Sequence, residues 1–190
     1  SDVYKRQGLA IITSMLIVFL IGDKFIKFFS TKKFTNPIRS DGPKDHLIKK
    51  IGTPTMGGVL ILIGLFSGVI LWADLYNPYN WLLIFITFSF GMLGAYDDYK
   101  KIRNKNSRGL SSKLKFILQI LIGLMSLYML YYFVDSELTT NLYFPFFKNL
   151  VINLGWFFIP FYLFVIVGSS NAVNLTDGLD GLATVPVILV

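Results

Sequence analysis

Two groups of acidic and amide side chains in this sequence stand directly after long apolar runs. Residues 168–183, GSSNAVNLTDGLDGLA, hold two asparagines and two aspartates within ten positions, and Asp97 and Asp98 end an earlier apolar run. Such side chains are costly at the edge of a bilayer unless they bind something, so we interpret both groups as parts of a functional site. Two carboxylate clusters at one membrane surface suggest a divalent metal and a phosphorylated substrate.

The spacing within the later group suits a site on one face of a helix. Asp177 and Asp180 are three residues apart, as are Asn171 and Asn174, and residues at this spacing are neighbours on a helix surface. Magnesium prefers oxygen ligands, takes one or two carboxylates, and leaves its other positions to water and phosphate. Amides can donate to phosphate or hydroxyl oxygens and accept from other groups. We therefore expect phosphoryl transfer, with a carboxylate off the metal acting as base.

The composition predicts a polytopic membrane protein. The chain has 190 residues, of which 54% are hydrophobic and 15% charged, and its mean hydropathy is +0.60; an ordinary soluble domain is far more polar. There is no cysteine, which excludes disulfides and cysteine-ligated metals. The net charge of +7 lies mainly in loops beside apolar runs, which argues against a nucleic-acid partner. The predicted fold class is all-α, an integral membrane protein of helices.

Five apolar runs are long enough to predict helices that span a bilayer. They cover residues 8–29, 55–73, 81–96, 116–134 and 151–168. A sixth run begins near Leu182 and reaches Val190, so we expect five complete spans and a truncated sixth. Residues 1–190 are read as a single membrane domain that forms the N-terminal part of a longer protein.

The basic residues predict the orientation of these spans. Lysine and arginine gather in the loops at about 30–54 and 97–115, whereas the alternate loops between predicted spans contain only Lys148. The positive-inside rule places both basic loops in the cytoplasm, and the segment at about 169–181 then lies on the same side. All the candidate groups can therefore build one site. A simpler alternative stays open for Asp97 and Asp98, because an acidic pair at a helix end can be merely solvated.

The TPTMGG segment at residues 53–58 has a mainly structural interpretation. Thr53 can cap a helix, and Pro54 suits a first helical position. Gly57 and Gly58 would allow two helices to pack closely. Capping and packing explain most of this segment without a function.

Three motifs carry a resemblance to a known family. They are HLIKKIGTPTMGG at 46–58, GAYDDYKKIRNKNSRGLSSKLKF at 94–116, and SSNAVNLTDGLDGLA at 169–183. The last two are similar to the superfamily of polyprenyl-phosphate sugar-1-phosphate transferases. The first resembles, within that superfamily, the bacterial phospho-N-acetylmuramoyl-pentapeptide-transferases. The resemblance covers nearly the whole chain.

The resemblance implies a reaction of peptidoglycan synthesis in the bacterial inner membrane, with the active site facing the cytoplasm. Phospho-MurNAc-pentapeptide would pass from UDP-MurNAc-pentapeptide to undecaprenyl phosphate, giving lipid I and UMP, with Mg²⁺ as cofactor. A homodimer is a further expectation. Because members of the family have about ten spans, we expect these 190 residues alone not to catalyse transfer.

The resemblance also assigns roles residue by residue, without deciding which carboxylate acts as base or nucleophile. Catalytic and metal-binding roles fall on Asp97, Asp98 and Asp177. Substrate-binding roles fall on Lys50, Thr55, Lys101, Lys105, Lys113, Asn171, Asn174 and Asp180.

Two other functions remain open. A sister transferase that uses UDP-GlcNAc would share the acidic pair and the Asn/Asp group, although TPTMGG speaks against it. A non-enzymatic channel or transporter would also place polar residues in membrane helices. It predicts them near the middle of the spans, whereas here they crowd the ends.

Overall fold

The computed structural model describes residues 2–31, 56–104, 109–133, 140–144 and 147–176. Most of these residues are helical, as the composition predicted. The chain divides into two compact units, Ser1–Lys115 and Phe116–Val190, and each is described by itself. The predicted sixth span lies outside the described residues.

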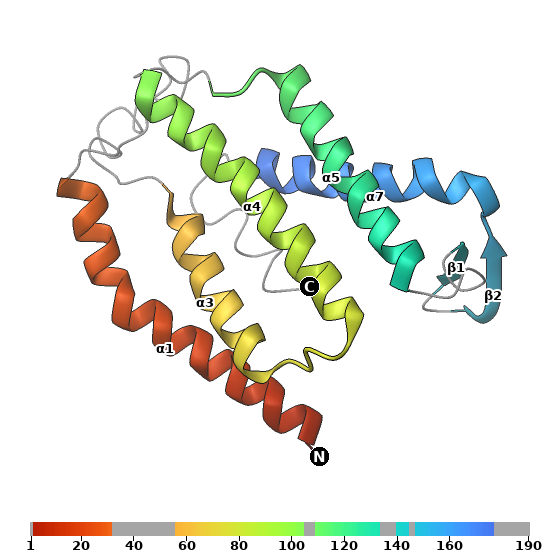
Figure 1. Cartoon of the computed structure of the whole chain (residues 1–190), viewed down its shortest axis with the longest axis horizontal. Helices are drawn as coiled ribbons and strands as arrows, with labels where there is room; N and C mark the ends of the chain where they lie inside the picture. The colour runs from red at the N-terminus through yellow and green to blue at the C-terminus, as the bar shows by residue number, and fades with distance from the viewer. Residues whose placement is uncertain (1, 32–55, 105–108, 134–139, 145–146, 177–190) are drawn as a thin grey trace. The chain divides into compact units, whose positions relative to one another are not determined.

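Among its described residues, the first unit has three long helices that lie side by side (Figure 1). They are α1 (Asp2–Thr31), α3 (Gly57–Trp72) and α4 (Pro78–Asn104). Helix α3 is antiparallel to both neighbours. At its C-terminal end, the indole Nε1 of Trp72 donates to Thr13 Oγ1 in the N-terminal half of α1 at 2.9 Å. On its other side, the ring of Phe66 lies 6.2 Å from the ring of Phe88, which is on α4. The C-terminal ends of α1 and α4 therefore share one end of the unit with the N-terminal end of α3.

Close packing of α1 on α3 depends on two glycines four residues apart. A Cβ at Gly64 would lie 2.7 Å from Val18 Cγ2, and a Cβ at Gly68 would lie 2.9 Å from the Ala10 carbonyl oxygen. This is the G-x-x-x-G arrangement of membrane helices, in which the missing side chains let two backbones approach. The two glycines thus set the distance between α1 and α3.

The predictions for the TPTMGG segment were wrong in two respects. A Cβ at Gly57 or Gly58 would meet no atom within 4 Å, so neither residue is a packing glycine. The N-cap of α3 is Met56, with φ of 69°, and not Thr53. A residue in this left-handed conformation interrupts the helical backbone, so α3 cannot begin before Gly57.

Helix α4 is longer than the apolar run at 81–96 that predicted it. Asn77 caps its start, because the Tyr79 backbone N–H donates to Asn77 Oδ1 at 3.0 Å, and Pro78 occupies the first helical position, where its missing N–H does no harm. At the other end the helix continues to Asn104. Asp97 and Asp98 are therefore held in the last turns of a helix and not in a loop.

The second unit contains α5 (Ser112–Phe133) apart from its first turn, which belongs to the first unit. It also contains strands β1 (Asn141–Phe144) and β2 (Phe147–Asn153), the short 3-10 helix η1 (Gly155–Phe157) and α7 (Phe158–Thr176). Ser111 caps α5 by accepting a hydrogen bond from the Leu114 backbone N–H at 3.3 Å. The two strands pair antiparallel, with Leu142 opposite Ile152. This hairpin corrects the all-α prediction.

The predicted fifth span at 151–168 was misplaced at both ends. Residues 151–153 belong to β2, and Gly155, with φ of +48°, turns the chain into η1 and α7. Apolar β-branched residues suit a strand as well as a membrane helix. Helix α7 then continues past Gly168 to Thr176, so Asn171 and Asn174 lie on it.

Four helices among the described residues are long and apolar enough to cross a membrane: α1, α4, α5, and the stretch from Gly155 to Thr176. Helix α3 is also apolar but has only 16 residues. Large apolar side chains on these helices face outward, for example Phe19, Tyr128 and Phe164. Such surfaces suit lipid, so the structure supports a multi-pass membrane protein.

Replacing Gly68 by Val tests the packing of α1 on α3. The added side chain must push the two backbones apart, and overpacking of this kind costs roughly 1–3 kcal/mol. The matched control is Gly58→Val, on the same helix, where a Cβ meets nothing within 4 Å. Thermal unfolding in detergent should show a lower midpoint for Gly68→Val than for the control. Equal midpoints would show that the close approach is not needed.

Candidate functional site

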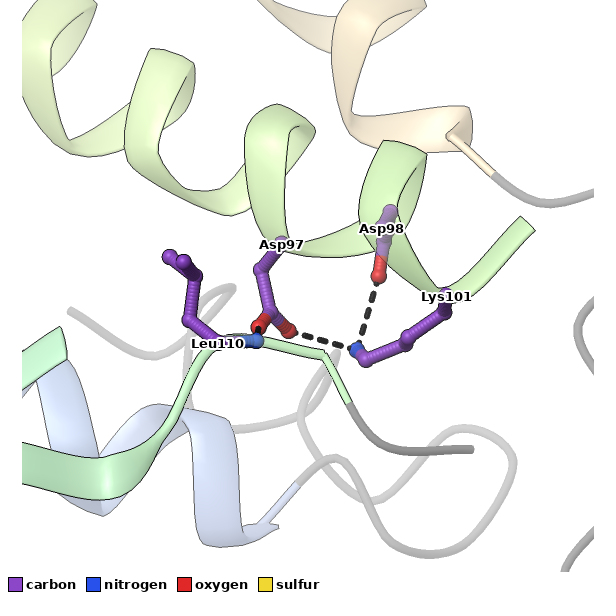
Figure 2. Close-up of polar contacts among 4 residues, drawn as sticks. All are labelled: Asp97, Asp98, Lys101 and Leu110. Carbon is purple, nitrogen blue, oxygen red and sulfur yellow. Dashed lines mark hydrogen bonds and ion pairs between the residues drawn. The ribbon is translucent and has the colours of Figure 1, made fainter. Parts of the chain in front are cut away.

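The acidic pair at the end of α4 is bridged by a lysine of the same helix. Lys101 Nζ lies 2.6 Å from Asp97 Oδ2 and 2.9 Å from Asp98 Oδ1, at the i,i+4 and i,i+3 spacings that a helix brings together. Figure 2 shows both carboxylates directed at this one ammonium group. A single cation therefore joins two adjacent negative charges beyond the apolar part of α4.

The backbone that follows α4 closes over Asp97. The Leu110 N–H donates to Asp97 Oδ1 at 2.6 Å (Figure 2). A Cβ at Gly109 would lie 2.7 Å from the Asp97 Cγ, so only glycine lets the chain pass this close to the carboxylate. Both Asp97 oxygens are thus engaged, whereas the Asp98 side chain is more open, with 29% of its surface exposed against 13% for Asp97.

These contacts set the charge state of the cluster. Partial burial by itself would raise the pKa of the Asp97 carboxyl, but the hydrogen bonds from Lys101 and Leu110 outweigh burial and lower that pKa below its usual value. Burial opposes the charge on Lys101 as well, yet bonds to Asp97 and Asp98 raise the pKa of its ammonium. The ion pair of Asp97 with Lys101 therefore stabilises the fold at neutral pH. This contribution is lost as the pH falls through the lowered pKa of Asp97.

The cluster fits a magnesium ion by donor type. Two carboxylates with room for water and phosphate are a common set for this ion, and Asp98 is the more accessible of the two. Within the described ranges, no group of three or more Asp, Glu, His or Cys side chains comes together. The Lys101 ammonium group contacts both carboxylates, so a metal that used both of them would compete with it.

The other described candidates lie around α5 and α7 of the second unit or at its border. The Asn171 amide donates to Gln119 Oε1 on α5 at 2.9 Å and to the Val167 carbonyl at 2.8 Å. Asn174 is exposed on α7, and Lys113 is exposed in the first turn of α5.

The remaining predicted site residues are not placed by the structure. Lys50, Thr55, Lys105, Asp177 and Asp180 lie outside the described residues. Their roles stay predictions.

Reasoning from the sequence missed three residues that the structure adds to these groups. Gly109 and Leu110 hold Asp97, and the signal for them was a glycine in a short loop between two predicted spans. Gln119 holds Asn171, and the signal was a lone amide within an apolar run, a residue type that usually needs a partner in a membrane helix.

The apolar helices and the bridged acidic pair at the end of α4 define a multi-pass membrane protein with a charged cluster at one helix end. The model of Glycosyl transferase family 4 matches residues 80–190. The chain belongs to this family. Residues 50–62 also match signature 1 of phospho-N-acetylmuramoyl-pentapeptide-transferase, in agreement with the resemblance found in the sequence.

A curated relative gives a more particular comparison. The phospho-N-acetylmuramoyl-pentapeptide-transferase of Pelagibacter ubique (strain HTCC1062) is 68% identical over 185 residues, which are 97% of this chain and 51% of the relative. The chain thus spans about half the length of the curated relative it matches.

Amide hydrogen exchange at Leu110 tests the closure over Asp97. Asp97→Ala removes the charged acceptor, and a hydrogen bond to a charged group contributes about 1.5–3 kcal/mol, so exchange should become roughly tenfold faster or more. Asp98→Ala is the matched control, because it removes the neighbouring carboxylate and leaves the Leu110 bond intact. If both variants exchange like the unmodified protein, Asp97 does not hold this segment.

Proposed function

We propose that the protein transfers phospho-MurNAc-pentapeptide from UDP-MurNAc-pentapeptide to undecaprenyl phosphate, producing lipid I and UMP. A lipid-phosphate oxygen attacks the sugar-linked phosphorus, a new phosphorus–oxygen bond forms, and the bond to UMP breaks. The observation that carries the proposal is the 68% identity to a transferase of this name over 97% of the chain. The signature match at residues 50–62 also supports it.

The bridged acidic pair supports a role in positioning and charge control. Phosphoryl transfer depends on placing reactants and neutralising developing charge more than on covalent chemistry by the protein. Asp97 is fixed by Lys101, Leu110 and the close approach of Gly109, so we assign it to holding the cluster in place. The more exposed Asp98 is the better candidate to meet the substrates, as base or as metal ligand.

A magnesium ion is part of the proposal. Asp98, with Asp97 and Asp177, would hold it, and when bound it would supply positive charge to the phosphate oxygens. Lys101 bridges the pair and lowers the pKa of Asp97, so this carboxylate is ionised at neutral pH and suited to receive a cation. Lys113, exposed at the start of α5, would attract the negatively charged substrates.

We also propose a bacterial inner-membrane location with five spans, a sixth beginning near Leu182, and a site facing the cytoplasm. Within the first unit, α1 and α4 end where α3 begins, so the start of the first basic segment and the acidic pair share one end. The excess of lysine and arginine in the two basic loops supports the cytoplasm as the side for that end. A homodimer remains an expectation from the family resemblance.

Substrate choice separates this function from that of a sister transferase. The full-length protein, reconstituted with undecaprenyl phosphate and Mg²⁺, should release UMP from UDP-MurNAc-pentapeptide and not from UDP-GlcNAc. The signature at residues 50–62 supports this preference. Release from UDP-GlcNAc alone would favour the sister enzyme, and no release from either substrate would defeat the proposal.

Removing single carboxylate charges tests the mechanism. Asp97→Asn, Asp98→Asn and Asp177→Asn should each lower transfer by about a hundredfold or more, because metal and base contributions each supply several kcal/mol. Lys113→Ala should mainly raise KM. A control is Asp74→Asn, which keeps the side-chain oxygen that accepts from the Tyr76 N–H in the turn before α4. Near-normal turnover in all three variants at the site would contradict the mechanism.

A further inference from the structure

The contact between α5 and α7 contains polar side chains within apolar helices. Gln119 and Ser126 of α5 are almost completely buried, with 2% and 0% of their surfaces exposed. Ser126 Oγ lies 3.0 Å from the Tyr162 hydroxyl, and Gln119 accepts from Asn171. Between them, a Cβ at Gly123 would lie 2.7 Å from Leu163 Cδ2, so the Leu163 side chain of α7 packs against the bare backbone of α5. Two hydrogen bonds therefore join the helices on either side of a small residue.

The orientation of the Asn171 amide is fixed by its partners. The Val167 carbonyl can only accept a hydrogen bond, so the Asn171 atom 2.8 Å from it must be the nitrogen. The same nitrogen lies 2.9 Å from the Gln119 side chain, which must therefore present its oxygen. Oxygen and nitrogen of an amide are assigned from such partners, and a backbone carbonyl gives an unambiguous reference.

Both N–H groups of the Asn171 side chain are consequently used inside the protein. The remaining polar atom of this amide is Oδ1, which accepts hydrogen bonds and donates none. Phosphate oxygens at neutral pH are chiefly acceptors, so Asn171 in this orientation cannot bind them. From the sequence, the Asn171 side chain could either donate a hydrogen bond to a ligand or accept one. In the structure only its Oδ1 is left for a ligand, so it can only accept.

We propose that Gln119 is a positioning residue that holds Asn171 so that Oδ1 accepts from a hydroxyl or N–H group of the nucleotide sugar. The inference rests on the proposed function for the identity of that ligand. Gln119 is too deeply buried to touch the substrate and acts through Asn171. In a low-dielectric membrane interior an unpaired amide is costly, so this buried bond holds one orientation firmly.

Side-chain amide spectra test the orientation without any need for activity. In the full-length protein labelled with ¹⁵N and ¹³C at asparagine, Asn171→Asp assigns the Asn171 signals by their disappearance. Adding UMP should shift the Asn171 carbonyl carbon and leave its N–H signals in place, and pyrophosphate should shift neither. A shift of the N–H signals with pyrophosphate would show donation to phosphate and overturn the proposal. A carbonyl response to Mg²⁺ alone would also overturn it, because the ligand would then be a cation.

Kinetics of three variants test the role of Gln119. Gln119→Met keeps the size of the side chain but removes the acceptor, so KM for the nucleotide sugar should rise about threefold to tenfold, the worth of one hydrogen bond, with kcat little changed. Gln119→Glu keeps an acceptor oxygen and should restore KM. Ser126→Ala removes the other bond between α5 and α7 and should leave KM unchanged.

Three outcomes have separate meanings. If KM rises equally in Gln119→Met and Ser126→Ala, Gln119 contributes only to the packing of α5 on α7. That result would overturn its positioning role. If Gln119→Met does not fold, the amide spectra of the unmodified protein still decide the direction of the Asn171 bond. If the full-length protein releases no UMP, the proposed function fails, and an undisturbed N–H pair would still support the acceptor orientation of Asn171.

Discussion

A single lysine that bridges two adjacent carboxylates at the end of an apolar helix fixes the backbone that follows α4. Asp97 and Asp98 would repel each other there, and Lys101, one turn further along α4, offsets that repulsion by contacting both carboxylates. Because both partners are on one helix, the bridge needs no other element to form. The Leu110 N–H and the bare backbone of Gly109 then dock on the fixed carboxylate, which determines where the chain turns toward α5.

The same principle operates in the second unit with neutral groups. Gln119 and Ser126 find partners on α7, and both lie within the apolar stretch of α5. This pairing bears on the alternative of a channel, for which polar residues along the spans would line a pathway. Here Gln119 and Ser126 each form a hydrogen bond with a side chain of the neighbouring helix α7, as polar side chains between packed membrane helices commonly do. Their burial favours a structural role over a conducting one.

The sequence predicted the helical membrane class, the acidic pair and the family, because hydropathy and short motifs are local properties. It was less successful wherever an outcome depended on contacts between segments. The run at 151–168 has the apolar content of a span, but pairing of β2 with β1 takes its first residues. Gly57 and Gly58 had the residue type for packing, whereas Gly64 and Gly68 face α1. The Leu110 N–H that binds Asp97 and the Gln119 side chain that binds Asn171 lie 13 and 52 residues away from them, beyond any local pattern.

A titration of the Asp97 carboxyl tests the bridge most directly. Carboxyl ¹³C spectra of aspartate-labelled protein in a lipid bilayer, with Asp97→Asn to identify the signal, would follow this group through acid pH. The pKa of Asp97 read from this signal should lie below the ordinary aspartate range, because Lys101 and Leu110 bind the carboxylate. In Lys101→Met this pKa should rise. An ordinary or raised pKa that Lys101→Met leaves unchanged would contradict the account, because the lysine would then not control the charge of the acidic pair.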